Sequence, residues 1–339
     1  MRMRPGMNGM GWTRRRWLAT SAGLVGMAWV GAWAKEPKMT KQVSADVDVA
    51  VIGGGPAGLE AALMLGRGMK SAVVFDAGPP RNARATGIMG FVTRDGINPM
   101  EFRRIAKGEL GKYGVRVEAS RVMAVDGERG RFEVRHEGGV VIAKRVVLTV
   151  GMVDSPVPIA GAEPFWGHHI FQCPYCHGWE HRGLPWGVLA SSIELVEHAP
   201  FFKNWSGPLT VFVAGLEVPG ELADKVGKAG VKLERRPILR AVGDGARMVG
   251  LEVGDEGGRR EIVPCEALIA RPPQSQTALV RELGLELDEA GFVKVDGKRQ
   301  TSRAGIFAAG DLCTAMQSAM GAAAAGQMVA AMVSVDLMS

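Results

Sequence analysis

Two cysteines separated by two residues are the strongest chemical feature of the sequence. Cys173 and Cys176 lie in the segment CPYCHGWE, and His177 follows the second cysteine directly. Such a pair can close a small disulfide ring that opens readily, and its geometry can lower the pKa of one thiol toward neutrality. The same pair can supply half of a zinc site, or a purely structural disulfide. We therefore expect a redox-active pair, with zinc binding and structural cross-linking as the alternatives.

Four histidines near the pair bear on this choice: His168, His169, His177 and His181. Two of them would complete a Cys2His2 zinc set. Structural zinc sites, however, usually take their two ligand pairs from elements separated by a longer loop, which favours the redox interpretation. A redox pair needs a group that moves protons, and an imidazole titrates near neutral pH. We expect His177 in this role and His169 as second choice, with a backbone hydrogen bond as the alternative for either ring.

The first 34 residues have the layout of an export signal. Arginines precede an aromatic and a leucine in the segment TRRRWL at residues 13–18, an uncharged run follows, and an A-x-A ending closes it at Ala34. This order is typical of a cleavable secretory signal and resembles the twin-arginine type. The alternative is an uncleaved anchor, but the run is short for a span of ~20 residues. We expect a signal peptide over 1–34, a periplasmic protein and no stable membrane span after cleavage.

Composition describes a soluble globular protein with room for two domains. The chain has 339 residues, of which 47% are hydrophobic and 22% charged. The net charge is +6, but the first 34 residues hold five arginines and no acidic residue, which leaves about +1 for the remainder. Because no basic face is left, nucleic acid is not expected as a partner.

The elements after residue 46 carry a dinucleotide fingerprint. A buried strand over Val47–Ile52 is followed by G-x-G-x-x-G at residues 53–58, a helix to Arg67, and a second strand over Ser71–Phe75 that ends at Asp76. The glycines permit the tight turn, the approach of a pyrophosphate and close packing of helix on strand, while the helix N-terminus offers N–H groups to the phosphates. The spacing of Asp76 suits hydrogen bonds from ribose hydroxyls.

A stretch far along the chain indicates which nucleotide binds. Residues 306–311 (IFAAGD) predict a strand that ends in a glycine turn and an acid, and an alanine-rich helix over Met316–Met332 is expected to follow. A carboxylate at Asp311 suits the ribityl hydroxyls of a flavin, and the helix dipole suits the electron-rich end of the flavin ring. We therefore expect FAD. The methionines of this helix have helical spacing, which is typical of core packing.

The order of these parts resembles the thioredoxin reductase-like, FAD-dependent pyridine nucleotide-disulfide oxidoreductases, over roughly residues 46–335. The resemblance implies an α/β fold of two Rossmann-like doubly wound domains, the second inserted into a discontinuous FAD-binding domain. The expected parts are 46–155 and 273–335 for the FAD domain and 156–272 for the insertion. A homodimer is implied by the resemblance alone. FAD contacts are carried over to Gly53, Gly55, Pro56, Ala57, Gly58, Asp76, Arg81, Asn82, Gly310, Asp311 and Gln317. For Arg81 and Asn82 an ordinary solvated turn is the alternative.

The inserted segment lacks the second nucleotide turn that NADPH-using members carry. After a short strand at residues 187–189 the chain reads Ala190-Ser191-Ser192, with Leu195 where a small residue is expected, and a helix is predicted over Ile193–Phe202. Side chains at these positions hinder the approach of a pyrophosphate. No Arg or Lys follows the next strand, Leu209–Val213, until Lys225. We therefore expect no productive NADPH binding. A divergent turn that binds loosely, or NADH held through Glu217, is the alternative.

The resemblance also assigns roles to the cysteines. It makes Cys173 the interchange thiol and places Cys176 against the flavin. The motif CPYCHG is closest to the flavin-dependent dithiol oxidase branch. We therefore expect an exported enzyme that oxidises a dithiol, either a small molecule or a thioredoxin-like protein, and passes two electrons through FAD to oxygen or another acceptor. The alternatives are an NAD(P)H-dependent thioredoxin reductase and a non-enzymatic FAD-bearing docking or electron-transfer module.

Overall fold

The structure is a computed structural model that describes residues 44–339. The expected twin-arginine signal over 1–34 and its cleavage site lie outside the described residues.

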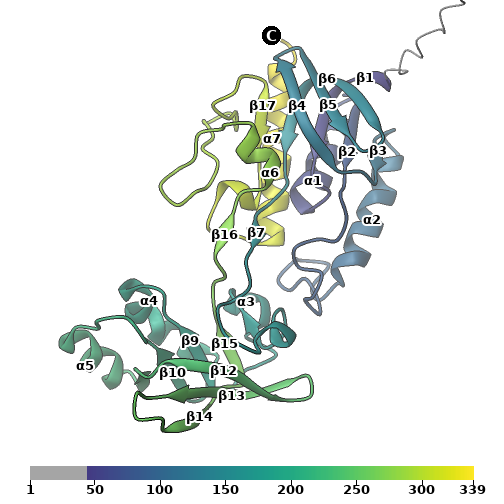
Figure 1. The fold of residues 1–339 in the computed structure, drawn as a ribbon. Coiled ribbons are helices and arrows are strands. Elements are labelled where there is room, and N and C mark those ends of the chain that lie inside the picture. Colours follow the sequence, from purple (N-terminus) through teal and green to yellow (C-terminus); the bar gives the residue numbers. More distant parts are fainter. Residues whose placement is uncertain (1–43) are drawn as a thin grey trace, which may run out of the picture. The chain divides into compact units, whose positions relative to one another are not determined.

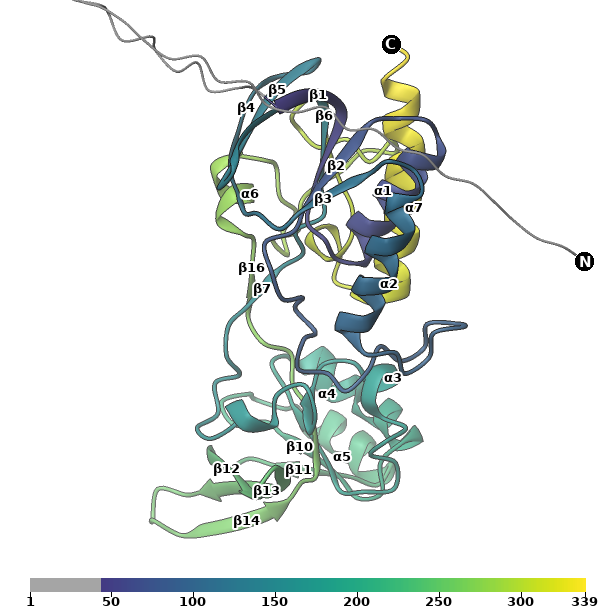
Figure 2. The ribbon, with the colours of Figure 1, turned by 90° about the vertical axis from the view of Figure 1, so that its right-hand side faces the viewer.

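A seven-stranded sheet organises the first part of the fold, in the order β3-β2-β1-β6-β5-β4 with β17 beside β6. Strands β1, β2, β3, β6 and β17 run parallel, and β4 and β5 are antiparallel to their neighbours. Helices α1, α2 and α7 lie on one side of this sheet (Figures 1 and 2). Its elements are β1 (Ser44–Ile52), α1 (Pro56–Arg67), β2 (Ala72–Phe75), α2 (Pro99–Gly111), β3 (Arg116–Glu118), β4 (Val122–Glu128), β5 (Arg131–His136), β6 (Gly139–Leu148), α6 (Ala278–Glu282), β17 (Ile306–Ala308), η3 (Asp311–Cys313) and α7 (Ala319–Asp336).

Helices α1 and α7 pack unusually close because one position on α7 has no side chain. A Cβ atom on Gly326 would lie 2.1 Å from the carbonyl oxygen of Ala57. The buried face of α7 consists of small residues and valines: Ala323, Gly326, Val329, Ala330 and Val333. Within residues 44–339, α7 is also the helix long and apolar enough to cross a membrane, with 22% of its length buried. Its buried face packs on α1 and belongs to the hydrophobic core of the first domain.

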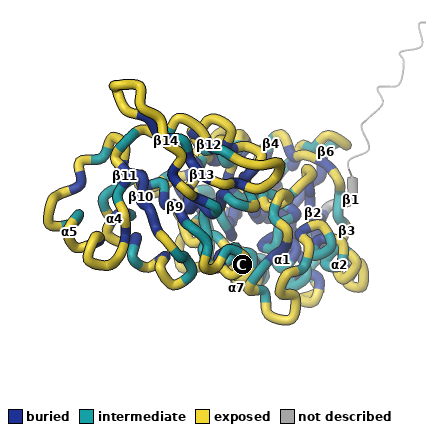
Figure 3. The backbone as a smooth tube through the Cα atoms, turned by 90° about the horizontal axis from the view of Figure 1, so that it is seen from below, coloured by how far each residue is buried: buried dark blue, intermediate teal, exposed yellow. Residues whose placement is uncertain are grey.

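A second, five-stranded parallel sheet forms the other part, in the order β11-β10-β9-β15-β8. Alternate side chains of its strands feed two separate cores, one under α4 and α5 and one against the antiparallel sheet β12-β13-β14. Figure 3 shows β9 and β10 as buried strands. The elements are η1 (Glu163–Phe165), β8 (Ile170–Phe171), α3 (Pro174–His177), β9 (Trp186–Leu189), α4 (Ile193–His198), η2 (Ala199–Asn204), β10 (Leu209–Phe212), α5 (Gly220–Lys228), β11 (Val231–Glu234), β12 (Ile238–Asp244), β13 (Arg247–Gly254), β14 (Arg260–Pro264) and β15 (Ala267–Ile269).

The chain leaves and re-enters the first sheet through a short two-stranded link. Strand β7 (Val153–Asp154) pairs antiparallel with β16 (Gln274–Ser275) (Figure 1). The second sheet is therefore an insertion between β6 and β17, and the predicted α/β fold class of two Rossmann-like domains is confirmed. The predicted domain boundaries fall beside these two strands, and the division itself stays a prediction.

Two predicted helices have different bounds. The helix predicted over Ile193–Phe202 ends at His198 and continues as the 3₁₀ segment η2, where Pro200 has no N–H to donate. The helix predicted from Met316 begins at Ala319, because the side chain of Ser318 accepts a hydrogen bond from Gly321 N and caps it. The packing role expected for its methionines was wrong, since Met316 and Met328 are exposed.

Candidate functional site

The two cysteines form a disulfide at the start of α3. Cys173 is the N-cap of this short helix, Cys176 lies in its last turn, and their Cα atoms are 5.3 Å apart. Pro174 occupies the first helical position, where its missing N–H costs no hydrogen bond. Among residues 44–339 no group of three or more His, Cys, Asp or Glu side chains could hold a metal ion. In this arrangement the two sulfurs are bonded to each other, and the role of the pair stays a prediction.

His177 directly follows the disulfide in sequence, and within residues 44–339 its half-buried ring makes no hydrogen bond of ordinary geometry. Its ring stacks on Phe171, with centroids 4.9 Å apart and planes 15° apart, and both ring nitrogens are buried without a partner. Burial lowers the pKa of His177, the charge of His181 lowers it further, and the nearby Gly167 carbonyl opposes this only in part. The imidazole is thus held neutral at neutral pH, where one of its two ring nitrogens can accept a proton.

Two of the other three histidines, His169 and His181, donate to backbone carbonyls. Nδ1 of His169 donates to the Glu266 carbonyl at 2.7 Å, and Nε2 of His181 donates to the His168 carbonyl at 3.0 Å. The rings of His169 and His181 lie 5.0 Å apart. His169, the second choice for proton transfer, therefore has the structural hydrogen bond that was its alternative role.

Aromatic side chains surround the outer side of α3. The Tyr175 ring, between the two cysteines, meets Trp205 edge-on at 5.2 Å and Phe201 at 6.3 Å. Trp205 stacks in turn on the buried Trp186. Gly178 makes this approach possible, because a Cβ atom there would lie 2.8 Å from the Trp205 ring and 3.0 Å from that of Trp186.

The fingerprint loop of the first domain is shaped to receive a phosphate. Gly53 has φ +119°, which only glycine adopts readily, and a Cβ on Gly58 would lie 1.9 Å from the Gly53 carbonyl oxygen. At Gly55, the N-cap of α1, a Cβ would meet nothing within 4 Å. No side chain caps this helix end. The loop therefore offers open space in front of free N–H groups, which fits the pyrophosphate of FAD.

The structure brings three predicted FAD-site residues from distant segments together. Arg81 donates through Nη1 to Asp311 at 3.1 Å and to Gln317 Oε1 at 2.5 Å. Its Nε and Nη2 bind both carboxylate oxygens of Asp154 on β7. Gln274 on β16 completes the cluster through hydrogen bonds to Asp154 and Gln317. Burial raises the pKa of Asp311, which the Arg81 guanidinium partly offsets.

The remaining predicted FAD residues differ in their surroundings. A Cβ on Gly310 would lie 3.0 Å from Cβ of Ala57, so the late glycine turn reaches the start of α1 beside Pro56. Asp76 is buried under the glycine loop, where Arg103 and Lys107 from α2 bind its carboxylate. Asn82 is exposed. These roles stay predictions, and Asp76 must share its oxygens with two cations if it also binds a ribose.

Sequence reasoning missed several residues near these sites: Arg103, Lys107, Asp154, Gln274, Phe201 and Trp205. The polar ones are scattered along helices and strands without a motif, and only the topology brings them to their partners. A signal existed for the aromatics, since Phe201, Phe202 and Trp205 cluster in a chain with 6% aromatic residues.

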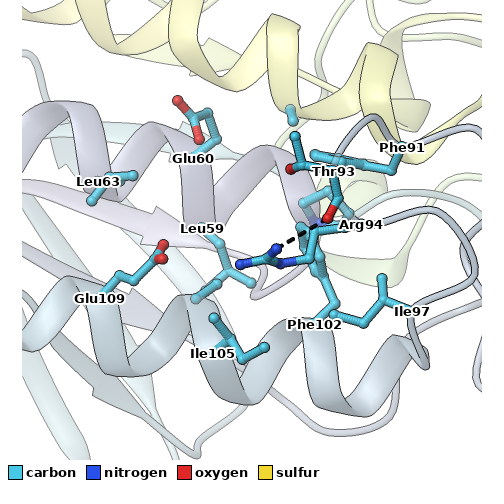
Figure 4. A pocket seen from close by; sticks show the side chains of 13 residues that line it. Leu59, Glu60, Leu63, Phe91, Thr93, Arg94, Ile97, Phe102, Ile105 and Glu109 are labelled. Carbon is cyan, nitrogen blue, oxygen red and sulfur yellow. Dashed lines mark hydrogen bonds between the residues drawn. The ribbon is translucent and has the colours of Figure 1, made fainter.

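A separate cavity of about 190 Å³ lies between α1, α2 and the loop before α2. Figure 4 shows Glu60 and Glu109 toward one end of it and Phe91 and Ile97 toward the other. Burial and the charge of Glu109 raise the pKa of Glu60. Pro56 is the one predicted site residue among those that line this cavity, and neither cysteine of the disulfide lines it.

The second nucleotide turn has the opposite character to the first. Ser192 is the N-cap of α4, and its hydroxyl accepts a hydrogen bond from Leu195 N at 3.4 Å. A hydrogen bond from Ser192 also lowers the pKa of Glu194 in the first turn, so a negative charge stays at this helix end. Leu195 packs against the core of the domain. Nothing in this turn favours a phosphate.

Comparisons with known proteins agree with the fold. The family model described as pyridine nucleotide-disulphide oxidoreductase matches residues 47–204 and 208–326. The chain is 33% identical to "Thioredoxin reductase tcpT" of Claviceps purpurea, with 86% of this chain and 95% of that protein covered. It is 31% identical to "Thioredoxin reductase sirT" of Leptosphaeria maculans, with 82% and 90% covered.

Among solved structures, an oxidoreductase from Agrobacterium tumefaciens superposes with a TM-score of 0.79 at 32% identity, covering 87% of this chain and 99% of that one. The fold of the present chain, its glycine loop, its Gly310-Asp311 turn and its disulfide lead to one assignment. The chain belongs to the pyridine nucleotide-disulphide oxidoreductase family, as a thioredoxin reductase-like, FAD-dependent disulfide oxidoreductase.

Proposed function

We propose that this enzyme works in the oxidative direction: it takes two electrons from a dithiol through Cys173–Cys176 and passes them through FAD to oxygen or another acceptor. The observation that carries the proposal is the second nucleotide turn. A reductase of this family needs a place for a nicotinamide nucleotide, and here Ser192 caps the helix end that would receive its pyrophosphate.

The rest of the inserted domain supports this choice. Glu217, after β10, is exposed and negatively charged, and it would repel a 2′-phosphate. Two arginines follow β11: Arg236 is bound to Glu234 and Glu261, and Arg235 is exposed. With no favourable site for a nucleotide donor, a dithiol is the remaining source of electrons for the disulfide.

The thiol chemistry balances without any further reactant. A substrate thiolate attacks Cys173 Sγ, the Cys173–Cys176 bond breaks, and Cys176 leaves as a thiolate. The second substrate thiolate then attacks the substrate sulfur of the mixed disulfide and releases Cys173. The substrate leaves as a disulfide, and the enzyme holds two thiols, two electrons richer. FAD, when bound, accepts these two electrons and allows the cysteine disulfide to re-form.

Each substrate thiol loses a proton to attack as a thiolate, each released enzyme thiolate can take one up, and His177 is the proposed carrier of one of these protons. Its lowered pKa keeps the ring neutral at neutral pH, so one ring nitrogen has a lone pair that can take a proton. The rate of the thiol step in wild-type enzyme should fall as the ring becomes protonated in acid. A His177→Gln variant that keeps the same acid limb in its pH–rate profile would remove His177 from the mechanism.

Anaerobic spectra of the purified protein test the direction of flow. Excess dithiol should bleach the yellow flavin, NADPH should not, and air should restore the colour if oxygen is the acceptor. Cys176→Ser should bind FAD normally and lose bleaching by dithiol. Rapid bleaching by NADPH would contradict the proposal and favour the second candidate, a nicotinamide-dependent reductase. This candidate is supported by the relatives that are named thioredoxin reductases. No response to either reductant would favour a non-enzymatic module.

We also propose a periplasmic location and a homodimer. The location is inferred from the signal layout of residues 1–34 and agrees with a chain that does without NADPH, which is not normally available outside the cytoplasm. Arg14→Lys with Arg15→Lys should retain the protein in the cytoplasm, as fractionation would show. The exposed apolar side chains of α7, Met320, Met328 and Val335, suit contact with a second copy. Sedimentation of a Met328→Glu variant as an unchanged dimer would exclude this face.

A further inference from the structure

Three aromatic side chains form a platform beside the disulfide that the thiol chemistry itself does not use. We call Tyr175, Phe201 and Trp205 the aromatic platform. Tyr175 is 73% exposed and Phe201 42% exposed, while Trp205 is half-buried behind them. Phe201 and Trp205 meet edge-on at 5.3 Å, and Tyr175 contacts both rings. Large aromatic surface exposed to water next to a reactive group calls for a functional explanation.

The platform is held rigidly to the helix that carries the cysteines. Trp205 stacks on Trp186, which is fully buried, at 6.4 Å and 12°. Phe201 contacts the buried Phe202. Because Gly178 leaves room for the Trp205 ring directly after α3, the rings and the disulfide belong to one packed unit. Tyr175 itself lies in the disulfide ring, one residue from Cys176.

The platform also carries no charge. Its three side chains are neutral, and the cation nearest in sequence, Lys203, donates its ammonium to the Gly207 carbonyl at 2.9 Å. On α4 and α5, the charge of Lys225 is paired with that of Glu197. A charged group placed here would lose water and gain no partner, whereas an aromatic ring would gain ring–ring contacts.

From these contacts we propose that the platform selects the substrate: it binds the aromatic or flat apolar portion of a small, neutral dithiol while one thiol of that molecule reaches Cys173. This rests on the proposed dithiol oxidation. A small molecule fits better than a protein because the exposed rings of Tyr175 and Phe201 are far smaller than the roughly 800 Å² per partner of a stable protein interface.

Two matched probes test the proposal. Benzene-1,2-dimethanethiol and cyclohexane-1,2-dimethanethiol carry their thiols on the same spacing and differ in the aromaticity of the ring. The rate of anaerobic flavin bleaching gives kcat/KM for each with the FAD-loaded enzyme. We expect wild type to prefer the aromatic probe by about 3- to 10-fold, the range of one or two aromatic contacts. Tyr175→Leu and Phe201→Leu should each reduce this ratio toward one.

Two further variants keep the test specific. Tyr175→Phe keeps the ring and should keep the preference. Trp179→Leu removes another exposed aromatic of the same segment, 67% exposed, which stacks against Arg182 and has no ring contact with the platform among the described residues. It should leave the preference unchanged. Flavin content and thermal unfolding show that each variant is folded and loaded.

The outcomes separate this inference from the function on which it rests. Bleaching by neither probe would overturn the proposed oxidation and the inference together. Equal kcat/KM for both probes, or an equal loss in Trp179→Leu, would overturn the inference and leave dithiol oxidation standing. A reduced thioredoxin-like protein that is oxidised faster than either probe, and more slowly in Tyr175→Leu, would replace the small molecule by a protein partner.

Discussion

The glycine loop of the first domain and the Ala190-Ser191-Ser192 turn of the second have the same topology and opposite properties. Each follows a buried parallel strand and begins a helix, and Gly55 and Ser192 are the corresponding N-caps. At Gly55 the space is open and the N–H groups of α1 are free, while at Ser192 a hydroxyl accepts the N–H of Leu195. The Ser192 side chain thus satisfies one N–H group at the start of α4, whereas no side chain does so at Gly55.

The third glycine position extends the contrast. Gly58 lets α1 approach the strand so closely that a Cβ would meet both the Gly53 carbonyl and the Thr149 hydroxyl. In the second domain the corresponding Leu195 contributes to the hydrophobic core. The first turn leaves space for a ligand, whereas Leu195 of the second turn packs on the core of its own domain. The two turns therefore differ although the sheets and helices around them correspond.

The largest effect is expected for Gly58→Ala. The new Cβ would lie 1.9 Å from a backbone oxygen, so α1 must move away from the strand, which costs about 1–3 kcal/mol or more and distorts the phosphate cradle. We expect protein without bound flavin, measured as the ratio of flavin to protein absorbance. Gly108→Ala is the matched control, because a Cβ on this exposed helical glycine meets nothing within 4 Å. Full flavin content in Gly58→Ala would show that the loop is not the FAD cradle.

Gly55→Ser transfers the cap of the second turn to the first. The backbone at Gly55, with φ −82° and ψ −178°, accepts any residue, and the added side chain meets no protein atom, so folding should be unaffected. The hydroxyl would satisfy N–H groups of α1 and occupy the place of a phosphate. We expect FAD affinity to fall by about 10-fold or more, measured by flavin release on dilution.

Gly55→Ala separates the effect of added bulk from the effect of the cap, because alanine adds a Cβ atom but no hydroxyl. It should lose less affinity for FAD than Gly55→Ser. Wild-type affinity in Gly55→Ser would break the comparison, since the cap would then not distinguish the two turns.

How much of this was readable from sequence depends on how local the pattern is. The glycine loop, its strand and α1 lie within about twenty residues, and their spacing predicted the element order. The start of α7 was placed too early, because an apolar run hides the capping role of Ser318. The spacing of the methionines also could not predict which of them are exposed. The face of α7 that packs on α1 has room only for small side chains, because of the close contact at Gly326, and this contact is not visible in the sequence.

Contacts between distant segments could not be predicted. Arg81 and Asp311 were expected near FAD, but their link to Asp154 and Gln274 depends on how β7 and β16 pair. The aromatic platform likewise exists only because η2 folds back onto α3. Sequence patterns identify residues that serve one element, whereas residues that join elements become visible with the topology.

Ser192→Ala should have a smaller effect, confined to the second domain. Loss of the cap should lower the free energy of unfolding by about 1 kcal/mol or less, since the hydrogen bond to Leu195 N is long at 3.4 Å. Flavin content should not change. Denaturant unfolding followed by tryptophan fluorescence measures this. Ser192→Gly sharpens the comparison: if it alone allowed NADPH to bleach the flavin, the cap would be the whole difference between the turns, whereas Glu194 and the missing cations predict no bleaching.

The smallest effect concerns how the two domains respond to acid. In the second domain, burial lowers the pKa of His177 below its ordinary value of 6.5. As pH falls below 6.5 the unfolded chain binds this proton before the folded one does, so stability is lost, by at most about 1.4 kcal/mol per pH unit. In the first domain, burial raises the pKa of Asp311, so the folded state binds its proton first and gains stability as pH falls toward 3.8.

His177→Phe isolates the histidine contribution. A phenyl ring keeps the stacking on Phe171 and removes two buried nitrogens without partners, so the variant should be slightly more stable than wild type at pH 7. The gap should widen as the pH is lowered from about 6.5 to about 5, and the two proteins should run parallel at higher pH. Unfolding midpoints across this range measure it. Parallel behaviour throughout would mean that His177 takes up its proton equally in both states, so that its buried position does not oppose protonation.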